Sequence, residues 1–370
     1  MNRYIISGGG TGGHIFPAIA IANQLKIVHP ESEFLFIGAY GKMEMTRVPE
    51  AGYKIEGLDV FGIRRDMSWK GIKSNLKLPF MLFKTMRKAK AIMRNFNPDV
   101  VIGVGGYASG PALKAAQKLK IKTIIQEQNS YPGKTNQWLA KKVAKICVAY
   151  DGLERFFQKD KIVKTGNPVR SEIINFQPKL EEAYTFFHLE KDKKTVLIMG
   201  GSQGARTINQ TVLGFIDEFK KMDYQLLWQT GELFYTENET QLSELISKKV
   251  KIVPFIKRMD LAYSVADYIV SRAGALAIAE LAIVGAPTIL IPLPTAAEDH
   301  QTANARQLSN AEAAILMPDK ESKENLFATL VNLLNDTEKS KTLAQNIKKF
   351  AKPDAIDRIV RVIKQIEVEI

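Results

Sequence analysis

The sequence predicts an α/β protein with two doubly wound parallel sheets, each belonging to a Rossmann-like domain. Two glycine-rich turns carry this prediction, at residues 8–13 and 200–205, because each follows a short apolar run and precedes a helical pattern. The apolar runs are Arg3–Ser7 and Thr195–Met199, so two similar units begin about 190 residues apart. With 370 residues, the chain is also long for a single hydrophobic core.

Other apolar runs predict the remaining strands, at 33–37, 53–58, 98–103, 122–126, 144–148, 162–163, 225–229, 251–254, 268–270 and 288–291. Helices are predicted after both glycine turns, with Pro17 in a first turn, and at 112–119, 233–247, 337–350 and 353–367. The charged, weakly patterned stretch 176–194 is expected to mark a domain boundary. The expected domains are 1–165 and 166–350, followed by a C-terminal helix at 351–370.

The bulk composition is that of a globular protein with a preference for anionic partners. Hydrophobic residues make up 45% of the chain and charged residues 25%, and the net charge is +13. The single cysteine, Cys147, excludes an intramolecular disulfide and is consistent with a reducing compartment. Because the first residues run directly into a strand and no apolar run approaches about 20 residues, we expect a soluble or peripheral protein without a signal peptide.

The segment 61–96 combines cations with large apolar side chains. It contains ten cations and one acid, Asp66, and its apolar residues include Phe61, Trp69, Phe80 and Phe83. Such a composition is typical of an interfacial membrane surface and predicts contact with anionic lipid. The alternative is an amphipathic helix whose apolar face lies in the core. Nucleic acid is disfavoured as a partner, because no nucleic-acid-binding motif accompanies the charge.

The first glycine turn and the helix after it predict a phosphate site, because free N–H groups and the helix dipole both favour an anion. The turn matches a dinucleotide fingerprint formally, but the strand at 33–37 ends in Gly38-Ala39-Tyr40-Gly41 with no acid for a ribose. A P-loop is excluded because no Gly-Lys-Ser/Thr follows. The turn ends at His14, which could be a capping imidazole; its position favours a general base for a reacting hydroxyl.

Polar side chains follow other predicted strands, and they favour group transfer from a nucleotide diphosphate. Glu127-Gln128-Asn129 ends one strand and suits a hydroxyl-rich ligand, with turn chemistry as the alternative.

The four histidines are far apart and no Asp-x-Asp pair occurs, so no metal site is predicted. A diphosphate would then be neutralised by helix N-termini and by cations such as Arg170 or Arg272. Oxidoreduction lacks its ribose acid, and hydrolysis lacks a nucleophile or metal.

Several blocks occur together in one order and carry a resemblance to a known family: Gly8–His14, Gly105-Gly106-Tyr107, Glu127-Gln128-Asn129, Gly166-Asn167-Pro168-Val169-Arg170, Gly200–Ala205 and Ser271-Arg272-Ala273-Gly274-Ala275. The chain resembles the MurG family of bacterial transferases, in glycosyltransferase family 28, over nearly its whole length. The resemblance implies a GT-B fold with a cleft between its domains. It also implies an N-terminal acceptor domain, a C-terminal domain for UDP-N-acetylglucosamine, and a final helix that returns to the N-terminal domain.

The resemblance also implies the residues of the site. Thr11, Gly12 and Gly13 would line the cleft at the donor, while Asn129 and Gln301 would contact the donor sugar. Arg170 and Ser202 would lie near the diphosphate, and Ile256 would meet uracil through its backbone. The run Ala275, Leu276, Ala277, Ile278, Ala279 and Glu280 would hold diphosphate and ribose, with Glu280 accepting from the ribose hydroxyls. Two positions depart from the family pattern: His300 replaces one of two glutamines, and Ala273 replaces a serine.

The implied activity is metal-independent transfer of N-acetylglucosamine, with inversion and without a cofactor, to the C4 hydroxyl of lipid I. The products would be lipid II and UDP, made at the cytoplasmic face of the cell membrane during peptidoglycan synthesis. His14 would be the base. Two alternatives stay open: another GT-B enzyme that uses UDP-N-acetylglucosamine, such as a lipid glycosyltransferase or nonhydrolysing epimerase, and a non-catalytic nucleotide-sugar-binding scaffold at the membrane.

Overall fold

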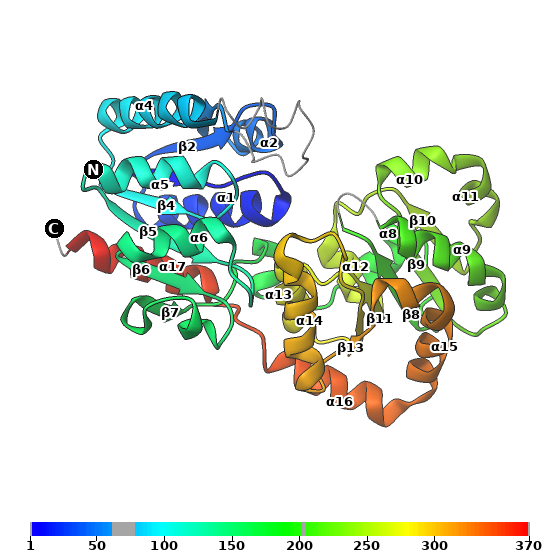
Figure 1. The fold of residues 1–370 in the computed structure, drawn as a ribbon. Coiled ribbons are helices and arrows are strands. Elements are labelled where there is room, and N and C mark those ends of the chain that lie inside the picture. Colours follow the sequence, from blue (N-terminus) through cyan, green and yellow to red (C-terminus); the bar gives the residue numbers. More distant parts are fainter. Residues whose placement is uncertain (1, 61–77, 202–204, 369–370) are drawn as a thin grey trace. The chain divides into compact units, whose positions relative to one another are not determined.

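A computed structural model describes residues 2–60, 78–201 and 205–368, and the side chains of all of these except 78–80 (Figure 1). The chain divides into two compact units. The first unit contains Met1–Val169 together with Asp354–Ile370, and the second unit contains Arg170–Pro353. Each unit is built around its own parallel sheet, so the two predicted doubly wound sheets are both present.

The sheet of the first unit contains, among the described residues, seven parallel strands in the order β3-β2-β1-β4-β5-β6-β7. The strands are β1 (Arg3–Ser7), β2 (Glu33–Ala39), β3 (Lys54–Leu58), β4 (Val100–Gly103), β5 (Lys122–Glu127), β6 (Lys145–Val148) and β7 (Ile162–Lys164). The helices are α1 (Gly12–Val28), α2 (Glu44–Glu50), α4 (Leu78–Phe96), α5 (Ser109–Lys118), α6 (Lys134–Leu139) and α17 (Ala355–Val368).

The strands of this unit are apolar on both faces because helices cover both faces. Ile5, Ile37 and Val101 belong to one buried cluster with residues of α4, α5 and α6. Ile6 follows Ile5 on β1, so its side chain lies on the opposite face of the sheet, and it is also fully buried. Helix α17 packs against α1, and Gln24 Nε2 donates to Asp357 Oδ1 at 2.8 Å. The last helix of the chain is therefore part of the first unit.

The sheet of the second unit has, in the described part of the chain, six parallel strands in the order β10-β9-β8-β11-β12-β13. The strands are β8 (Thr195–Met199), β9 (Gln225–Gln229), β10 (Val250–Val253), β11 (Ala266–Ser271), β12 (Thr288–Leu290) and β13 (Ile315–Leu316). The helices are α7 (Ser171–Ile174), α8 (Leu180–Phe187), α9 (Arg206–Lys220), α10 (Glu232–Glu237), α11 (Glu239–Leu245), α12 (Met259–Val265), α13 (Ala275–Val284), α14 (His300–Asn310), α15 (Ser322–Asn335) and α16 (Thr337–Lys348).

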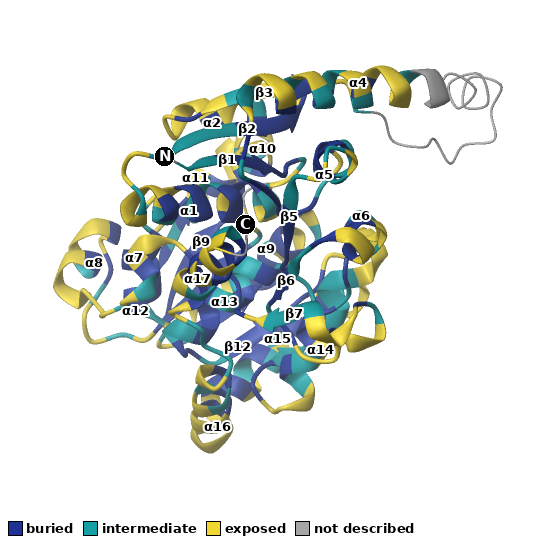
Figure 2. Cartoon of the chain, turned by 90° about the vertical axis from the view of Figure 1, so that its left-hand side faces the viewer, coloured by how far each residue is buried: buried dark blue, intermediate teal, exposed yellow. Residues whose placement is uncertain are grey.

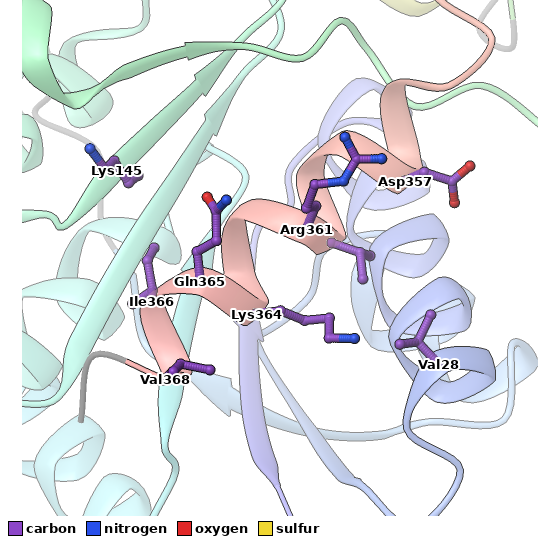
Figure 3. Close-up of a pocket in the computed structure, with 9 residues that line it drawn as sticks. Val28, Lys145, Asp357, Arg361, Lys364, Gln365, Ile366 and Val368 are labelled. Atoms are coloured by element: carbon purple, nitrogen blue, oxygen red, sulfur yellow. The ribbon is translucent and has the colours of Figure 1, made fainter.

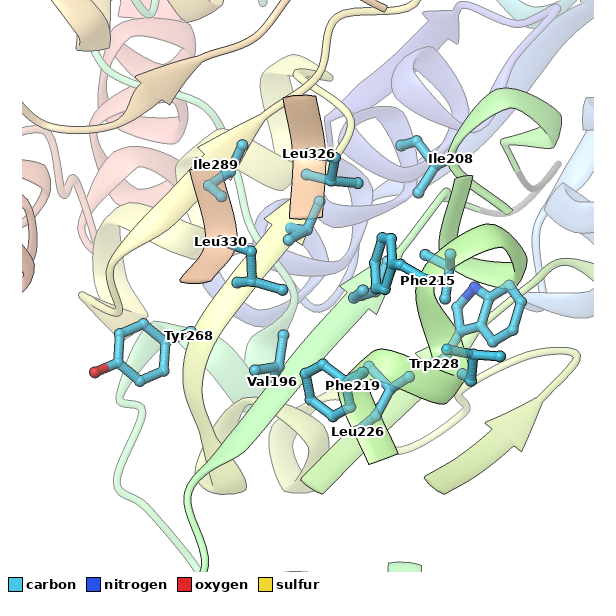
Figure 4. Packing of buried hydrophobic residues seen from close by; sticks show 14 of the residues in the cluster. Val196, Ile208, Phe215, Phe219, Leu226, Trp228, Tyr268, Ile289, Leu326 and Leu330 are labelled. Atoms are coloured by element: carbon cyan, nitrogen blue, oxygen red, sulfur yellow. The ribbon is translucent and has the colours of Figure 1, made fainter. Parts of the chain in front are cut away.

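The core of the second unit lies between its strands and helices α9 and α15 (Figure 4). Val196 and Trp228 from the sheet meet Phe215 and Phe219 from α9 and Leu330 from α15. Trp228 is fully buried, and its indole N–H donates to Asn209 Oδ1 at 3.1 Å. The polar atom of this large side chain is thus satisfied inside the core.

Three sequence expectations about local structure are wrong. Pro17 lies inside α1 rather than in its first turn, because the glycine turn itself starts the helix at Gly12. The stretch 176–194 is not a boundary: it contains α8, which packs on α12 and buries Phe187. The helix expected at 233–247 is two helices, since the Asn238 side chain donates to the Phe234 carbonyl at 2.8 Å and the backbone leaves the helical region there.

Candidate functional site

Both sheets have the same strand order, and in both the order reverses direction beside the first strand. The reversal lies between β1 and β4 in the first unit and between β8 and β11 in the second. Ligands of open α/β sheets bind outside the carboxyl ends of the strands at such points. The glycine turn at 8–13 follows β1, and Gly200 and Gly201 follow β8, so these described residues lie at the expected ligand position in each unit.

Two glycine turns of the first unit are packed backbone to backbone. A Cβ added at Gly106, which has φ of +84°, would lie 2.2 Å from the Gly9 carbonyl oxygen. A Cβ at Gly8 would lie 2.0 Å from Val104 Cγ2. No side chain fits at either position without movement of its neighbours. The turn after β1 is therefore held by the turn after β4.

His14 is half-buried in the first turn of α1 and faces this packed backbone. Its Nδ1 lies 3.1 Å from the Gly9 carbonyl oxygen and 3.4 Å from Thr11 Oγ1. Because a carbonyl oxygen only accepts, the contact with Gly9 requires the hydrogen on Nδ1. Nε2 is then the proton acceptor of the neutral ring, and the ring edge that carries it lies beside Gly105, where an added Cβ would be 2.9 Å from Nε2. This is the tautomer that a general base at Nε2 needs.

The first glycine turn contains an internal carboxylate that the sequence analysis missed. Glu44 is fully buried, and its Oε2 accepts the Gly10 N–H at 2.9 Å. This contact uses the Gly10 N–H and places a carboxyl group inside the turn, which disfavours the phosphate predicted there. Glu44 is the first residue of α2, 34 positions after Gly10, so the spacing of residues in the sequence does not predict this contact.

Asn129 is held by a second buried carboxylate, at the end of β5. Glu127 Oε1 accepts from the backbone N–H of Asn129 at 3.0 Å and from its side-chain amide at 3.2 Å. Glu127 Oε2 accepts from the Gly133 N–H at 3.1 Å and the Asn136 amide at 2.8 Å. Burial raises the pKa of the Glu127 carboxyl, and these four hydrogen bonds oppose that increase. Glu127 therefore shapes the loop that presents Asn129.

The predicted residues Glu280 and Arg170 contact each other in the second unit. Arg170 Nε lies 2.9 Å from Glu280 Oε1, and the Tyr263 hydroxyl donates to Glu280 Oε2 at 2.9 Å. The Glu280 side chain is 6% exposed and the Arg170 side chain is 44% exposed. Burial raises the pKa of Glu280, while the Arg170 charge and the Tyr263 hydrogen bond lower it. Tyr263 was not predicted, because it comes from α12, 17 positions before Glu280.

Arg272 does not present its guanidinium to a ligand. The group is buried, and its Nη1 donates to the Ile291 and Pro292 carbonyl oxygens at 3.2 Å each and pairs with Asp319. Its Nε is buried without a hydrogen-bond partner. These contacts tie β11 to the segments that follow β12 and β13, so the predicted role in neutralising a diphosphate is replaced by a structural one.

The other predicted residues of the second unit also lie beyond strand ends. Ile256 follows β10 with its side chain buried, and α13 begins at Ala275 with no acid in its first turn. Gln301 Oε1 accepts the Leu293 N–H at 2.9 Å, and burial lowers the pKa of the neighbouring His300. Ser202 and the basic residues of 61–77 lie outside the described residues.

In the first unit, the predicted Thr11 and Gly13 are exposed and Gly12 is half-buried at the start of α1. The first N–H groups of a helix have no intrahelical acceptor, so this end of α1 can donate to a ligand.

A groove of about 770 Å³ in the first unit lies away from the carboxyl ends of the strands (Figure 3). It runs beside α17 and is lined by Val28 at the end of α1, by Lys145, and by Arg361 and Lys364. Lys145 is the first residue of β6, so the groove is at the amino edge of the sheet. The groove is therefore separate from the candidate site.

Within residues 2–60, 78–201 and 205–368, no group of three or more His, Cys, Asp or Glu side chains is placed to hold a metal ion. A separate search of the same ranges finds no helix with the length and apolar character needed to cross a membrane.

Two family models together match most of the chain. Residues 4–148 match the glycosyltransferase family 28 N-terminal domain, and residues 195–359 match the glycosyltransferase family 28 C-terminal domain. The chain belongs to glycosyltransferase family 28. The GT-B fold expected from the sequence is confirmed by the two parallel sheets and by a solved member, Acinetobacter baumannii MurG. That structure has a TM-score of 0.78 and 27% identity, covering 99% of this chain and 100% of its own.

Curated relatives within family 28 are similar over their full length. Proteins of Cytophaga hutchinsonii and Parabacteroides distasonis are 50% and 49% identical to the chain, each over 98% of it and over 96% and 98% of their own lengths. Both are named UDP-N-acetylglucosamine–N-acetylmuramyl-(pentapeptide) pyrophosphoryl-undecaprenol N-acetylglucosamine transferase. A UDP-GlcNAc 2-epimerase of Neisseria meningitidis has a TM-score of 0.66 over 99% of this chain and 100% of its own, but with 15% identity it shares only the fold.

The structural role of Arg272 predicts that Arg272→Ala lowers the free energy of unfolding of the second unit by about 3 kcal/mol, because Asp319 loses its buried partner. Urea unfolding followed by tryptophan fluorescence, to which Trp228 in the core of the second unit contributes, measures this loss. The matched control is Arg206→Ala, whose side chain is 73% exposed in its pair with Glu237 and which should change stability by less than about 1 kcal/mol. An Arg272→Ala protein of unchanged stability that no longer binds UDP would restore the predicted ligand role.

Proposed function

We propose that this family 28 enzyme transfers N-acetylglucosamine from UDP-N-acetylglucosamine to the C4 hydroxyl of the muramoyl sugar of lipid I. The products are lipid II and UDP, and the reaction is a step of peptidoglycan synthesis. The observation that carries the proposal is the sequence identity of 49% and 50%, over 98% of the chain, with two relatives whose names state this activity. The site geometry is consistent with it, because it supplies a candidate base in one unit and, in the other, a helix N-terminus with no acid in its first turn.

The proposal assigns the donor nucleotide to the second unit and the acceptor to the first. In the first unit, the Glu44 carboxylate already occupies the turn that would otherwise hold a phosphate. In the second unit, α13 begins at Ala275 after its N-cap Gly274, without a side-chain cap and without an acid in its first turn, so its N-terminus is suited to a diphosphate. Glu280 lies further along the same helix, and each oxygen keeps a second lone pair to accept a ribose hydroxyl.

The proposed mechanism is a single displacement that needs no metal. Nε2 of His14 removes the proton from the acceptor hydroxyl as its oxygen attacks the anomeric carbon of the donor. The bond between this carbon and the UDP oxygen breaks, so the configuration inverts and the electron pair leaves with UDP. The N-terminal N–H groups of α13 stabilise the charge that develops on the diphosphate. Thr11, Gly12, Gly13, Asn129 and Gln301 complete the contacts to the sugar in this proposal.

Replacing His14 tests the mechanism. His14→Ala should lower kcat by about 10²–10⁴-fold with little change in donor affinity, because the imidazole acts on the acceptor hydroxyl. Transfer of radiolabel from UDP-N-acetylglucosamine to a lipid I analogue gives kcat, and UDP titration gives affinity. The control is His29→Gln at the C-cap of α1, about 22 Å from His14 along the helix axis.

Three outcomes would contradict this account. Equal losses of turnover and donor affinity in His14→Ala would make the imidazole a binding group. Loss of transfer by the unsubstituted enzyme in EDTA would require a metal. Conversion of the donor at C2 in the absence of acceptor would indicate an epimerase instead.

The described part of the basic segment supports a membrane-facing surface on the first unit. On α4, Thr85, Ala89 and Met93 are buried, whereas Leu82 and Phe83 are 47% and 68% exposed. The core alternative thus accounts for one face of the helix but leaves these two apolar side chains in solvent. Buried and exposed residues alternate along α4 (Figure 2). Lys84, Arg87, Lys88, Lys90 and Arg94 lie on the same helix, and α4 contains no acid.

We propose that α4 brings the enzyme to the anionic cytoplasmic leaflet, where the lipid-linked acceptor resides. The double variant Leu82→Ser, Phe83→Ser should bind vesicles of phosphatidylglycerol and phosphatidylcholine at least about tenfold more weakly, because each apolar side chain contributes about 1.5 kcal/mol or more when buried. The control is Leu233→Ser, which is 70% exposed in the second unit. Co-sedimentation measures binding, and binding that ignores the phosphatidylglycerol content would contradict the proposal.

A further inference from the structure

The side chain of Glu44 occupies a slot that two glycines leave open. A Cβ at Gly9 would lie 2.1 Å from Glu44 Oε1, and a Cβ at Gly38 would lie 2.6 Å from Glu44 Cγ. The carboxylate is 0% exposed, although Glu44 is the first residue of the short helix α2. The two glycines come from different strand ends, those of β1 and β2, so the slot exists only in the folded unit.

Both oxygens of the Glu44 carboxyl group accept hydrogen bonds in the slot. Oε2 accepts the Gly10 N–H at 2.9 Å, and Oε1 accepts the Ala39 N–H at 3.0 Å. Both partners are donors, so both oxygens must accept. A glutamine in the same place would turn its own NH₂ group toward one of these N–H groups and leave that donor buried and unpaired.

The peptide between Gly9 and Gly10 connects this carboxylate with His14. Its N–H donates to Glu44, and its carbonyl oxygen accepts from His14 Nδ1 at 3.1 Å. The same oxygen is confined on another side by Gly106, where an added Cβ would be 2.2 Å away. A hydrogen bond to the N–H of an amide increases the negative charge on its oxygen, so the two bonds strengthen each other.

We propose that Glu44 is a positioning residue for His14, acting through the Gly9–Gly10 peptide. The carboxylate holds the peptide so that its carbonyl binds Nδ1–H, which orients the ring, selects the tautomer and makes Nε2 a stronger base. The arrangement resembles the carboxylate–histidine pair of hydrolytic triads, with one peptide unit inserted between the two groups. This inference rests on the proposed role of His14 as the base.

Glu44→Gln is the direct test, with Glu50→Gln as its matched control, since Glu50 lies on the same helix with its side chain 52% exposed. Glu44→Gln should lower kcat about 10- to 100-fold, the usual cost of removing a partner that orients a functional histidine, with little change in the KM for the donor. The acidic limb of the pH–rate profile should move to lower pH, because a weaker base has a lower pKa. Glu50→Gln should change neither.

A double-mutant cycle separates positioning from a general structural effect. In a His14→Ala background, Glu44→Gln should cause no further loss of kcat, because its effect passes through the imidazole. An equal loss in both backgrounds would overturn the inference. If the unsubstituted enzyme shows no transfer, the proposed function fails; if only the cycle is additive, the inference about Glu44 fails alone.

A second readout uses the unsubstituted enzyme, so it does not depend on whether a variant folds. Imidazole ¹⁵N shifts of His14 in the unsubstituted enzyme should show the neutral ring protonated on Nδ1. A ring protonated mainly on Nε2 would overturn the inference.

Discussion

One peptide unit in the first glycine turn fixes the geometry around the candidate base. Its carbonyl oxygen faces the Gly106 backbone and the His14 ring, while its N–H faces the Glu44 carboxylate. A Cβ at Gly9 would collide with the Glu44 carboxyl group, and a Cβ at Gly106 would collide with the Gly9 carbonyl oxygen. Gly8 and Gly9 are therefore needed because the second turn and the Glu44 carboxyl group approach the backbone where a Cβ would lie.

The two units share a strand order but use their first turns differently. In the first unit an internal carboxylate takes the place of a phosphate and leaves a histidine beside the turn. In the second unit the buried acid Glu280 lies further along α13, paired with Arg170 and Tyr263, and the start of that helix carries no acid. In the proposed function, this difference lets one architecture, used twice, bind a nucleotide in one unit and an acceptor hydroxyl in the other.

Features that depend on neighbouring residues could be predicted from the sequence. Short apolar runs gave β1, β8 and β9 with correct ends, and the repeated strand–glycine–helix opening predicted two parallel sheets. Contacts between distant segments could not be predicted. The Glu44 carboxyl group accepts a hydrogen bond from Gly10, although the two residues belong to different segments. Tyr263 of α12 likewise donates to Glu280 of α13. Arg272 pairs with Asp319, which lies 47 positions later in the chain. The two-residue strand β13 was missed because so short a run has no readable period.

In the proposed function, the nucleotide binds the second unit, while the first turn of the first unit is filled by its own carboxyl group. Amide hydrogen exchange with saturating UDP tests this most directly. The account predicts slower exchange around Ile256 and over 274–280, with Gly8, Gly9 and Gly10 unchanged. Protection of these three glycines by UDP, with 274–280 unaffected, would contradict it.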